Sequence, residues 1–467
     1  MKTSTLCLLG ALGVMGLSAC SLTPKLDKAT PELPNTYDAA VSLGAEAAPV
    51  SGLSPWWEVL GDAQLNQWVQ RALSQSPQAR LAASRMLEAD ALLRQAGAAL
   101  FPEVNASIGG VNNQVTQLGA VPVSPGLAVA RTDRSVGLST SYELDLWGKL
   151  RSADQVAKSS ALASRYALAT VHTTLASAVV QTWLNLRSLD AQIDLTRQSL
   201  ANRQEALSIV TRRQGGGLAS EVDVQAAQPA VLALQAQLAE LQRQRALSEN
   251  LLSVLLNTPG LKVEAQTRLP EVPQVPAGLP SSLLTARPDV RDAEAQLIAA
   301  NARIGLARAA LFPTLSLTAA AGSQSADLSN LLKPESFTYS LGLNLLAPIF
   351  DAGRRKAVVE QVSAQQQQLA ANYQQTVLNA FKEVRDALAS TEQNAATERA
   401  LSAQKDSQTA TFKLTQVRLD AGYVAPLQLL DAQRNLLDAQ AALVRARAAR
   451  LSATVDLFKA LGGGWQP

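Results

Sequence analysis

The sequence predicts an internally duplicated membrane protein of the α+β class, in which four β-strands per chain contribute to a closed β-barrel that continues into very long α-helices. Two stretches carry this prediction: FTYSLGLNLLAPIFDAGRRK, residues 337–356, and STSYELDLWGKLR, residues 139–151. Each begins as an alternating, aromatic-bearing strand, ends at a glycine followed by basic residues, and runs into a long helical pattern. Helices of that length are rare in soluble domains, so we interpret each stretch as the junction between a barrel and a helical tunnel.

Composition agrees with long helices and excludes several other classes of protein. Hydrophobic residues make up 47% of the chain but aromatic residues only 4%, which suits small, interdigitating helical side chains. The net charge is +3 with both signs scattered, so no basic face predicts nucleic-acid binding. After residue 20 no apolar run is long enough for a membrane-spanning helix, whereas barrel strands would give a much weaker signal.

The amino-terminal stretch reads as an export signal. Residues 1–19 hold one lysine and an apolar core, and they end in Leu-Ser-Ala before Cys20, which resembles the bacterial lipobox. We therefore expect a signal peptide over residues 1–19, a covalent lipid on Cys20 as the only attached group, and a lipidated, proline-rich tether over residues 20–55. Ser21 favours sorting to the outer membrane. The alternative is an ordinary signal peptide, with Cys20 a spectator.

The residue pattern in the first half of the mature chain predicts helices, then a β-hairpin, then further helices. Asp62 is a candidate N-cap for a helix over residues 64–73, and a second helix runs over residues 77–100 until Pro102 stops it. The period then changes to two, with a β-hairpin at about residues 103–147 whose alternation breaks off in a Gly- and Pro-rich loop and resumes near Val136.

The second half repeats the first. Arg287-Pro288-Asp289-Val290 echoes residues 76–79 at an offset of 211, and the segment Asp420-Ala421-Gly422 echoes residues 215–217 at an offset of 205. The chain thus divides into a first repeat over residues 56–260, a linker over 261–285, and a second repeat over 286–467 with a hairpin at about 314–349.

The lengths of the helical patterns fit together. Residues 148–213 and 353–418 each allow a helix of roughly 60 residues, about 90–100 Å long, and the helices that return at 220–256 and 426–461 reach about 55 Å. The helices before the hairpins add about 35 Å each. A returning helix and a helix that precedes a hairpin, placed end to end, are therefore together about as long as one long helix.

The hairpins cannot form a complete wall in one chain. Four strands leave two open edges, which lipid does not tolerate, whereas three chains supply twelve strands, within the size range of closed membrane barrels. The alternative, a soluble sheet, leaves no amphipathic segment to cover it.

Several motifs resemble one family: WWEVLGDAQLNQWVQRAL, SYELDLWGKLR, RPDVRDAEAQLIAANARIGLARAALFP, APIFDAGRRK, LDAQRNLLDAQ and KALGGGW. They resemble the TolC-type outer-membrane factors, and most closely the lipidated OprM/NodT-like branch, over essentially the whole mature chain. The resemblance implies a homotrimer in outer-membrane lipid, with a twelve-stranded barrel continuous with a helical periplasmic barrel.

The same resemblance implies a function. The chain would be the exit duct of a tripartite efflux system, exporting drugs or other small molecules that an inner-membrane pump and a periplasmic adaptor deliver. Two alternatives stay open at this point, an exit duct for type I protein secretion and a periplasmic coiled-coil scaffold.

No catalytic or metal-binding constellation is evident, so we expect no enzyme and no metal site. His172 is the only histidine and lies in the middle of a helical pattern, which excludes a His-based triad or a His cluster. We interpret it as a surface or groove residue. The run at residues 215–217 follows no strand and lacks Gly-Lys-Ser/Thr, so it reads as a helix–helix turn rather than a phosphate loop.

The turns between long and short helices are the candidate periplasmic gate. The charged and polar candidates around them are Asp431, Asp420, Arg418, Gln428, Glu221 and Asp223. In the family this end is narrowed by carboxylate rings, and Asp431 matches a family gate residue; three copies near one axis would bind cations and repel anions. The chain departs from the family at Val424 and Gln428, so Arg418, or Glu221 with Asp223, could hold the closed state instead. Solvated charges at a turn are the alternative.

The same turns are the candidate docking surface for the adaptor. Small and apolar residues lie there, with glycines able to adopt positive φ: Gly217, Leu218, Ala219, Ser220, Gly422, Tyr423, Val424 and Ala425. The alternative is that these residues only shape the turns.

Overall fold

The computed structural model describes residues 22–26, 31, 55–116, 129–273, 287–463 and 465. The predicted signal peptide, Cys20 and most of the predicted tether lie outside the described residues, so lipidation stays a prediction. By its contacts the chain divides into two compact units. One contains the sheet with residues 87–163 and 293–372, and the other contains residues 164–292 and 373–467 with the helices that precede residue 87.

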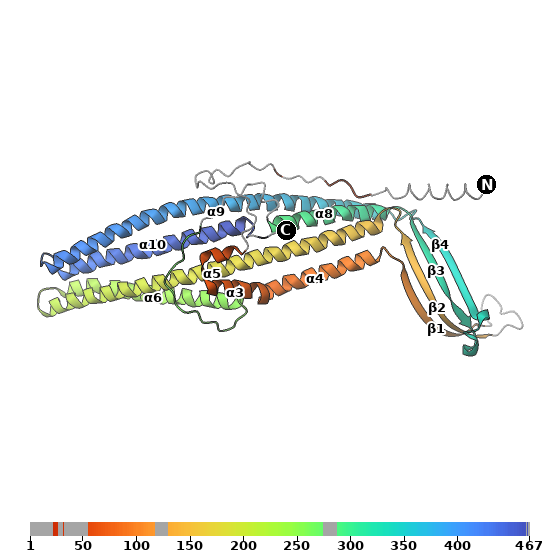
Figure 1. Ribbon diagram of the computed structural model, residues 1–467, viewed down its shortest axis with the longest axis horizontal. Coiled ribbons are helices and arrows are strands. Elements are labelled where there is room, and N and C mark those ends of the chain that lie inside the picture. The colour runs from red at the N-terminus through yellow and green to blue at the C-terminus, as the bar shows by residue number, and fades with distance from the viewer. Residues whose placement is uncertain are drawn as a thin grey trace. The chain divides into compact units, whose positions relative to one another are not determined.

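Three helices and one strand of the first repeat each have a counterpart of identical length in the second, whereas β2 contains 15 residues and β4 contains 10. Figure 1 shows these elements. At an offset of 211 residues, α4 (Pro77–Ala98) matches α8 (Pro288–Ala309) and β1 (Glu103–Gln114) matches β3 (Thr314–Ser325). At an offset of 205, α5 (Lys149–Gly215) matches α9 (Arg354–Asp420) and α6 (Glu221–Leu255) matches α10 (Pro426–Ala460). Both offsets predicted from the sequence are thereby confirmed.

The two longest helices, α5 and α9, contain 67 residues each. At 1.5 Å per residue each reaches about 100 Å, as the sequence predicts. Among the described residues, no helix is both long enough and apolar enough to cross a bilayer.

The unit with the sheet contains four antiparallel strands in the order β1-β2-β3-β4, where β2 spans Ala130–Leu144 and β4 spans Phe337–Leu346. The register aligns Leu138 with Ala106, Ala321 and, across β3, Tyr339. Because side chains alternate along a strand, this register gathers most of the apolar side chains of the four strands on one face.

The second strand of the hairpin is longer than its stretch of hydrophobic alternation. Strand β2 begins at Ala130, six residues before the alternation resumes at Val136. The intervening polar residues still pair with β1, for example Asp133 with Val111 and Arg131 with Asn113. Backbone pairing extends the hairpin beyond the part that hydrophobic alternation marks.

Each strand-to-helix junction is built from an aspartate, a glycine and an arginine. Asp145 accepts hydrogen bonds from the backbone N–H groups of Leu150 at 2.9 Å and Arg151 at 3.0 Å, and it pairs with the Arg151 side chain at 3.0 Å. Gly148 has a φ of +72°, a conformation open to glycine at little cost. The carboxylate thereby stabilises the amino end of α5 at its first turn.

The second junction uses the same device. Asp351 accepts from the backbone N–H groups of Gly353 at 3.0 Å and Arg355 at 3.2 Å, and it pairs with the Arg355 side chain at 3.0 Å. Gly353 has a φ of +83°. The two stretches that organise the sequence therefore share one local solution for changing from strand to helix.

The core of the other unit forms around Trp56, in the 3-10 helix η2 (Trp56–Leu60). Trp56 stacks on Phe458 of α10 with ring centroids 5.1 Å apart, and the same core contains Val179 of α5 and Leu252 of α6. Helix α3 (Ala63–Gln75) follows, and Asp62 is its N-cap, as predicted, accepting from the Leu65 N–H at 2.8 Å.

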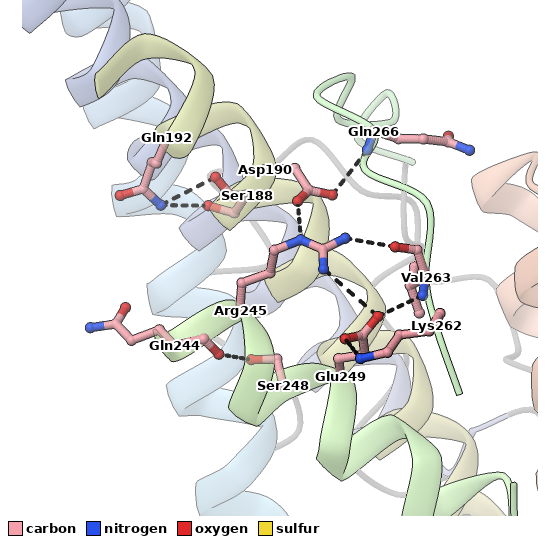
Figure 2. A network of polar contacts seen from close by, with 10 residues as sticks. All are labelled: Ser188, Asp190, Gln192, Gln244, Arg245, Ser248, Glu249, Lys262, Val263 and Gln266. Carbon is pink, nitrogen blue, oxygen red and sulfur yellow. Dashed lines mark hydrogen bonds and ion pairs between the residues drawn. The ribbon is translucent and has the colours of Figure 1, made fainter. Parts of the chain in front are cut away.

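A buried polar network attaches the segment after α6 to the helices (Figure 2). The side chain of Asp190 on α5 is only 3% exposed and accepts from Arg245 Nε at 2.6 Å and from the Gln266 N–H at 2.9 Å. Arg245 also donates to the Val263 carbonyl at 2.7 Å, and Glu249 accepts from the Val263 N–H at 2.6 Å. The start of the predicted linker is therefore fixed on α5 and α6.

Substituting Asp190→Ala should release this segment, because it leaves Arg245 without its closest carboxylate and the Gln266 N–H without an acceptor. Loss of one partner of a buried pair costs about 3–5 kcal/mol. We expect trypsin to cleave after Lys262 and Arg268 much faster than in the parent protein.

Glu240→Ala is the matched control. The pair of Glu240 with Arg243 on the same helix is exposed, and such pairs contribute about 0–1 kcal/mol. Equal trypsin protection in the two variants would contradict a stabilising role for the network.

Candidate functional site

The two turns that join long and short helices have the same backbone geometry. Gly217 and Gly422 have φ values of +72° and +80°. The Leu218 N–H donates to the Arg213 carbonyl and the Tyr423 N–H to the Arg418 carbonyl, both at 2.8 Å. This pattern, with a left-handed glycine and a bond back across the last helical turn, is a common end of α-helices.

The predicted docking residues project from these turns. Leu218 is 74% exposed and Tyr423 is 79% exposed, and Val222 in the next helical turn is also exposed. Ala219 and Val424 are half-buried, while Gly217, Ser220, Gly422 and Ala425 are exposed. The turns thus present large apolar side chains to solvent at equivalent positions of the two repeats.

Two of the gate and docking candidates are used locally to start α6. Ser220 and Asp223 form a capping box, in which the Ser220 N–H donates to Asp223 at 2.7 Å and the Asp223 N–H donates to Ser220 Oγ at 3.2 Å. These bonds from Ser220 hold the pKa of the Asp223 carboxyl below its ordinary value. The charged cap is therefore lost only as pH falls through that lowered pKa. Glu221 beside it is exposed.

Asp431 faces a residue that the sequence analysis did not single out. Its Oδ1 lies 3.8 Å from Nη1 of Arg203 on α5, and an equal distance from Arg434 one turn along its own helix. Asn202, next to Arg203, donates to the Leu430 carbonyl at 3.2 Å and to Gln433 Oε1 at 2.9 Å. A polar contact therefore joins the long helix of the first repeat to the short helix of the second.

The remaining gate candidates lie near the second turn. Asp420 accepts from Gln416 Nε2 at 2.8 Å, and Gln428 and Arg418 are exposed. Within the described part of one chain, the ion pairs recorded for Asp431 are with Arg203 and Arg434 rather than with Arg418. No sequence pattern marks Arg203, because its counterpart in the second repeat is Gln408.

The apolar face of the sheet is the second candidate surface. Ile108 is 88% exposed and Leu341 is 81% exposed, and Leu138, Leu343 and Leu345 on the same face are also exposed. A contiguous apolar patch on an extended sheet marks contact with lipid or protein. The opposite face carries small and polar side chains, where Gln324 donates to Asp133 at 2.7 Å.

Neither a metal site nor a catalytic arrangement is evident in the part of the chain that the structure describes. No group of three or more His, Cys, Asp or Glu side chains there could hold a metal ion. His172 is half-buried at the wall of a cavity of about 340 Å³ that Trp56, Trp57 and Trp465 also line. Burial lowers the pKa of His172.

Comparison with known proteins agrees with this architecture. The model of the outer membrane efflux protein family matches residues 68–258 and 279–463. The solvent efflux pump outer membrane protein SrpC of Pseudomonas putida is 34% identical over 459 residues, 96% of each chain. The pyoverdine export outer membrane protein OpmQ of Pseudomonas aeruginosa is 35% identical over 476 residues, 100% of this chain and 98% of its own.

A solved structure shows the same fold. The CmeC outer membrane channel of Campylobacter jejuni matches with a TM-score of 0.86 at 27% identity, over 96% of each chain. The chain therefore belongs to the outer membrane efflux protein family, as an efflux channel of the outer membrane rather than an enzyme.

Proposed function

We propose that three copies of this chain form the exit duct of a tripartite efflux system, anchored by a lipid on Cys20 and gated at the helix turns. An inner-membrane pump would deliver substrates through a periplasmic adaptor that docks on the exposed turns around Leu218 and Tyr423. One relative is named for solvents and another for pyoverdine. These names support small organic molecules as the substrates, and transport through the duct itself needs no chemistry.

The observation that carries this proposal is the incomplete, one-sided sheet. Strands β1 and β4 lie at its two edges, and one face is apolar and exposed. In lipid, unpaired backbone groups at such edges each cost several kcal/mol. Pairing β4 of one chain with β1 of the next keeps the antiparallel alternation, and three chains then supply twelve strands.

The duplication also indicates which helices meet between subunits. Inside one chain α5 contacts α10: Gln181 Nε2 donates to the Ser452 carbonyl at 3.0 Å, and Ser452 Oγ donates to Gln181 Oε1 at 2.8 Å. The offset of 205 residues carries Gln181 to Asp386 on α9 and Ser452 to Leu247 on α6. Repeating the contact head to tail places α9 of one subunit against α6 of the next, and such contacts close into rings.

Helix α6 has the surface that this contact needs. Leu247 is 53% exposed, Leu251 is 51% exposed and Val254 is 71% exposed. Their spacing of four and three residues puts them on one face of the helix. An exposed apolar stripe at the positions that the duplication selects supports packing against a second copy.

A disulfide cross-link tests the assembly. Asp386→Cys combined with Leu247→Cys should give covalent dimers and trimers on mild oxidation of membranes, because disulfides form only where Cα atoms approach within about 7 Å. The control combines Asp386→Cys with Leu232→Cys, an exposed α6 position about 22 Å away along the helix. Monomers alone in both variants would contradict the head-to-tail trimer.

The contact between Arg203 and Asp431 supports a gate at the turns. The carboxylate is 59% exposed, so each copy of this ion pair contributes about 0–1 kcal/mol, and three copies act together on one constriction. A link this weak suits a duct that a docking partner can open.

Conductance in planar bilayers tests the gate. Arg203→Ala and Asp431→Ala should both raise the open probability, and Asp431→Ala should also reduce cation preference, since it removes three carboxylates near the axis. High salt should shrink the difference from the parent protein. Asp438→Ala, also exposed on α10, is the control. Traces identical to the parent protein for both gate variants would remove this contact from the gate.

Efflux of small molecules and type I protein secretion predict different phenotypes. Deleting the gene should raise sensitivity to organic solvents and dyes, and the intact gene should restore resistance. Unchanged sensitivity together with loss of a secreted protein would favour the secretion alternative.

A further inference from the structure

The segment just after position 20 lies on the helices that flank the sheet, in the same compact unit. Asn301 of α8 donates to the Pro24 carbonyl at 2.8 Å, and Arg308 donates to the Leu22 carbonyl at 3.4 Å. The Thr23 hydroxyl lies 3.5 Å from that of Ser152 on α5. Three consecutive residues are thus held from two helices.

The helices leave space for this segment at Gly305. A Cβ added there would lie 3.0 Å from Thr23 Cα and 3.0 Å from Ser152 Oγ, and still closer to the Thr23 hydroxyl. Glycine is unfavourable inside a helix compared with alanine, so a specific packing reason is expected. At the offset of 211 residues the corresponding position in α4 is Arg94. Of these two corresponding positions, glycine therefore occurs in α8, the helix that contacts Leu22 and Pro24.

The polar side chains of this groove are buried. Asn301 is 8% exposed and Ser152 is 7% exposed. Buried polar groups are nearly always hydrogen-bonded, and here the partners are the backbone of Pro24 and the hydroxyl of Thr23. The groove therefore fits an extended peptide at this position.

We propose that Ser152, Asn301, Gly305 and Arg308 form a binding site for the mature amino terminus, which sets the level of the membrane anchor beside the sheet. Helix α8 ends at Ala309, five residues before β3 begins at Thr314. Position 20 precedes Leu22 by two residues, which span at most about 7 Å of extended chain. The inference rests on the proposed lipid at Cys20, which this site would hold at the foot of the apolar face.

Occupancy of the site is tested by a second disulfide. Thr23→Cys with Ser152→Cys should oxidise within one chain in intact membranes, whereas Thr23→Cys with Lys158→Cys, about 9 Å further along α5, should not. Adding Gly305→Ala should abolish the cross-link, because its methyl group occupies the space of Thr23. Adding Gly97→Ala should leave the cross-link intact, since a Cβ there meets only Asp154 Oδ1 at 3.8 Å. Absence of the Thr23–Ser152 cross-link would overturn the proposal.

The role in anchoring is tested by comparing lipidated and unlipidated chains. In the lipidated chain Gly305→Ala should lower the yield of outer-membrane trimer severalfold relative to Gly97→Ala. In a chain exported by a signal peptide without a lipobox, the two variants should give equal yields. An equal loss of trimer yield from Gly305→Ala with and without the lipobox would show that the groove contributes only to packing and has no role in anchoring. The mass of the mature amino terminus separately reports the lipid, so failure of the proposed lipidation is distinguishable from an empty site.

Discussion

Backbone hydrogen bonding at the edges of the sheet constrains the rest of the molecule. Strands β1 and β4 have partners on one side only, and the face that they share with β2 and β3 is apolar. Water can satisfy such edges but lipid cannot. A sheet of this kind is stable in a membrane only when further strands complete it, and the antiparallel order allows copies of the same chain to do so.

Duplication connects this constraint to the helices. Helices α5 and α9 begin within a few residues of β2 and β4, and each junction uses an aspartate and an arginine with a glycine at positive φ. Four residues separate β2 from α5 and seven separate β4 from α9. Because the corresponding helices have equal lengths, the turns at their far ends are also equivalent, down to the same 2.8 Å backbone hydrogen bond. The contact of α5 with α10 lies inside the chain, and in the proposed trimer its repetition supplies the contact between subunits.

Much of this could be predicted from the sequence because it depends on local periodicity. The offsets of 211 and 205, the existence of two very long helices, the N-cap at Asp62 and the amphipathic hairpins all follow from residue spacing. Features that join distant residues could not be predicted in this way. The ion pair of Asp190 with Arg245 bridges 55 positions, and the contact of Thr23 with Ser152 bridges 129.

The candidate gate residues show the same limit of prediction from sequence. Sequence likeness selected Asp431, but its partner Arg203 lies 228 residues away with no matching residue in the other repeat. Asp223, another gate candidate, forms the capping box of α6 with Ser220, a local role that the sequence analysis did not assign to it. A charge near a turn can stabilise the end of its own helix or contact a neighbouring helix, and these contacts are visible only in the fold.

The mass of the folded protein in detergent tests the central claim most directly. Native mass spectrometry of the purified mature chain should give three times the monomer mass. Hydrogen exchange on the same sample should show the amides of β1 and β4 protected as well as those of β2 and β3. A folded monomer whose β1 and β4 amides are equally protected would contradict the account, because one chain would then complete its own sheet.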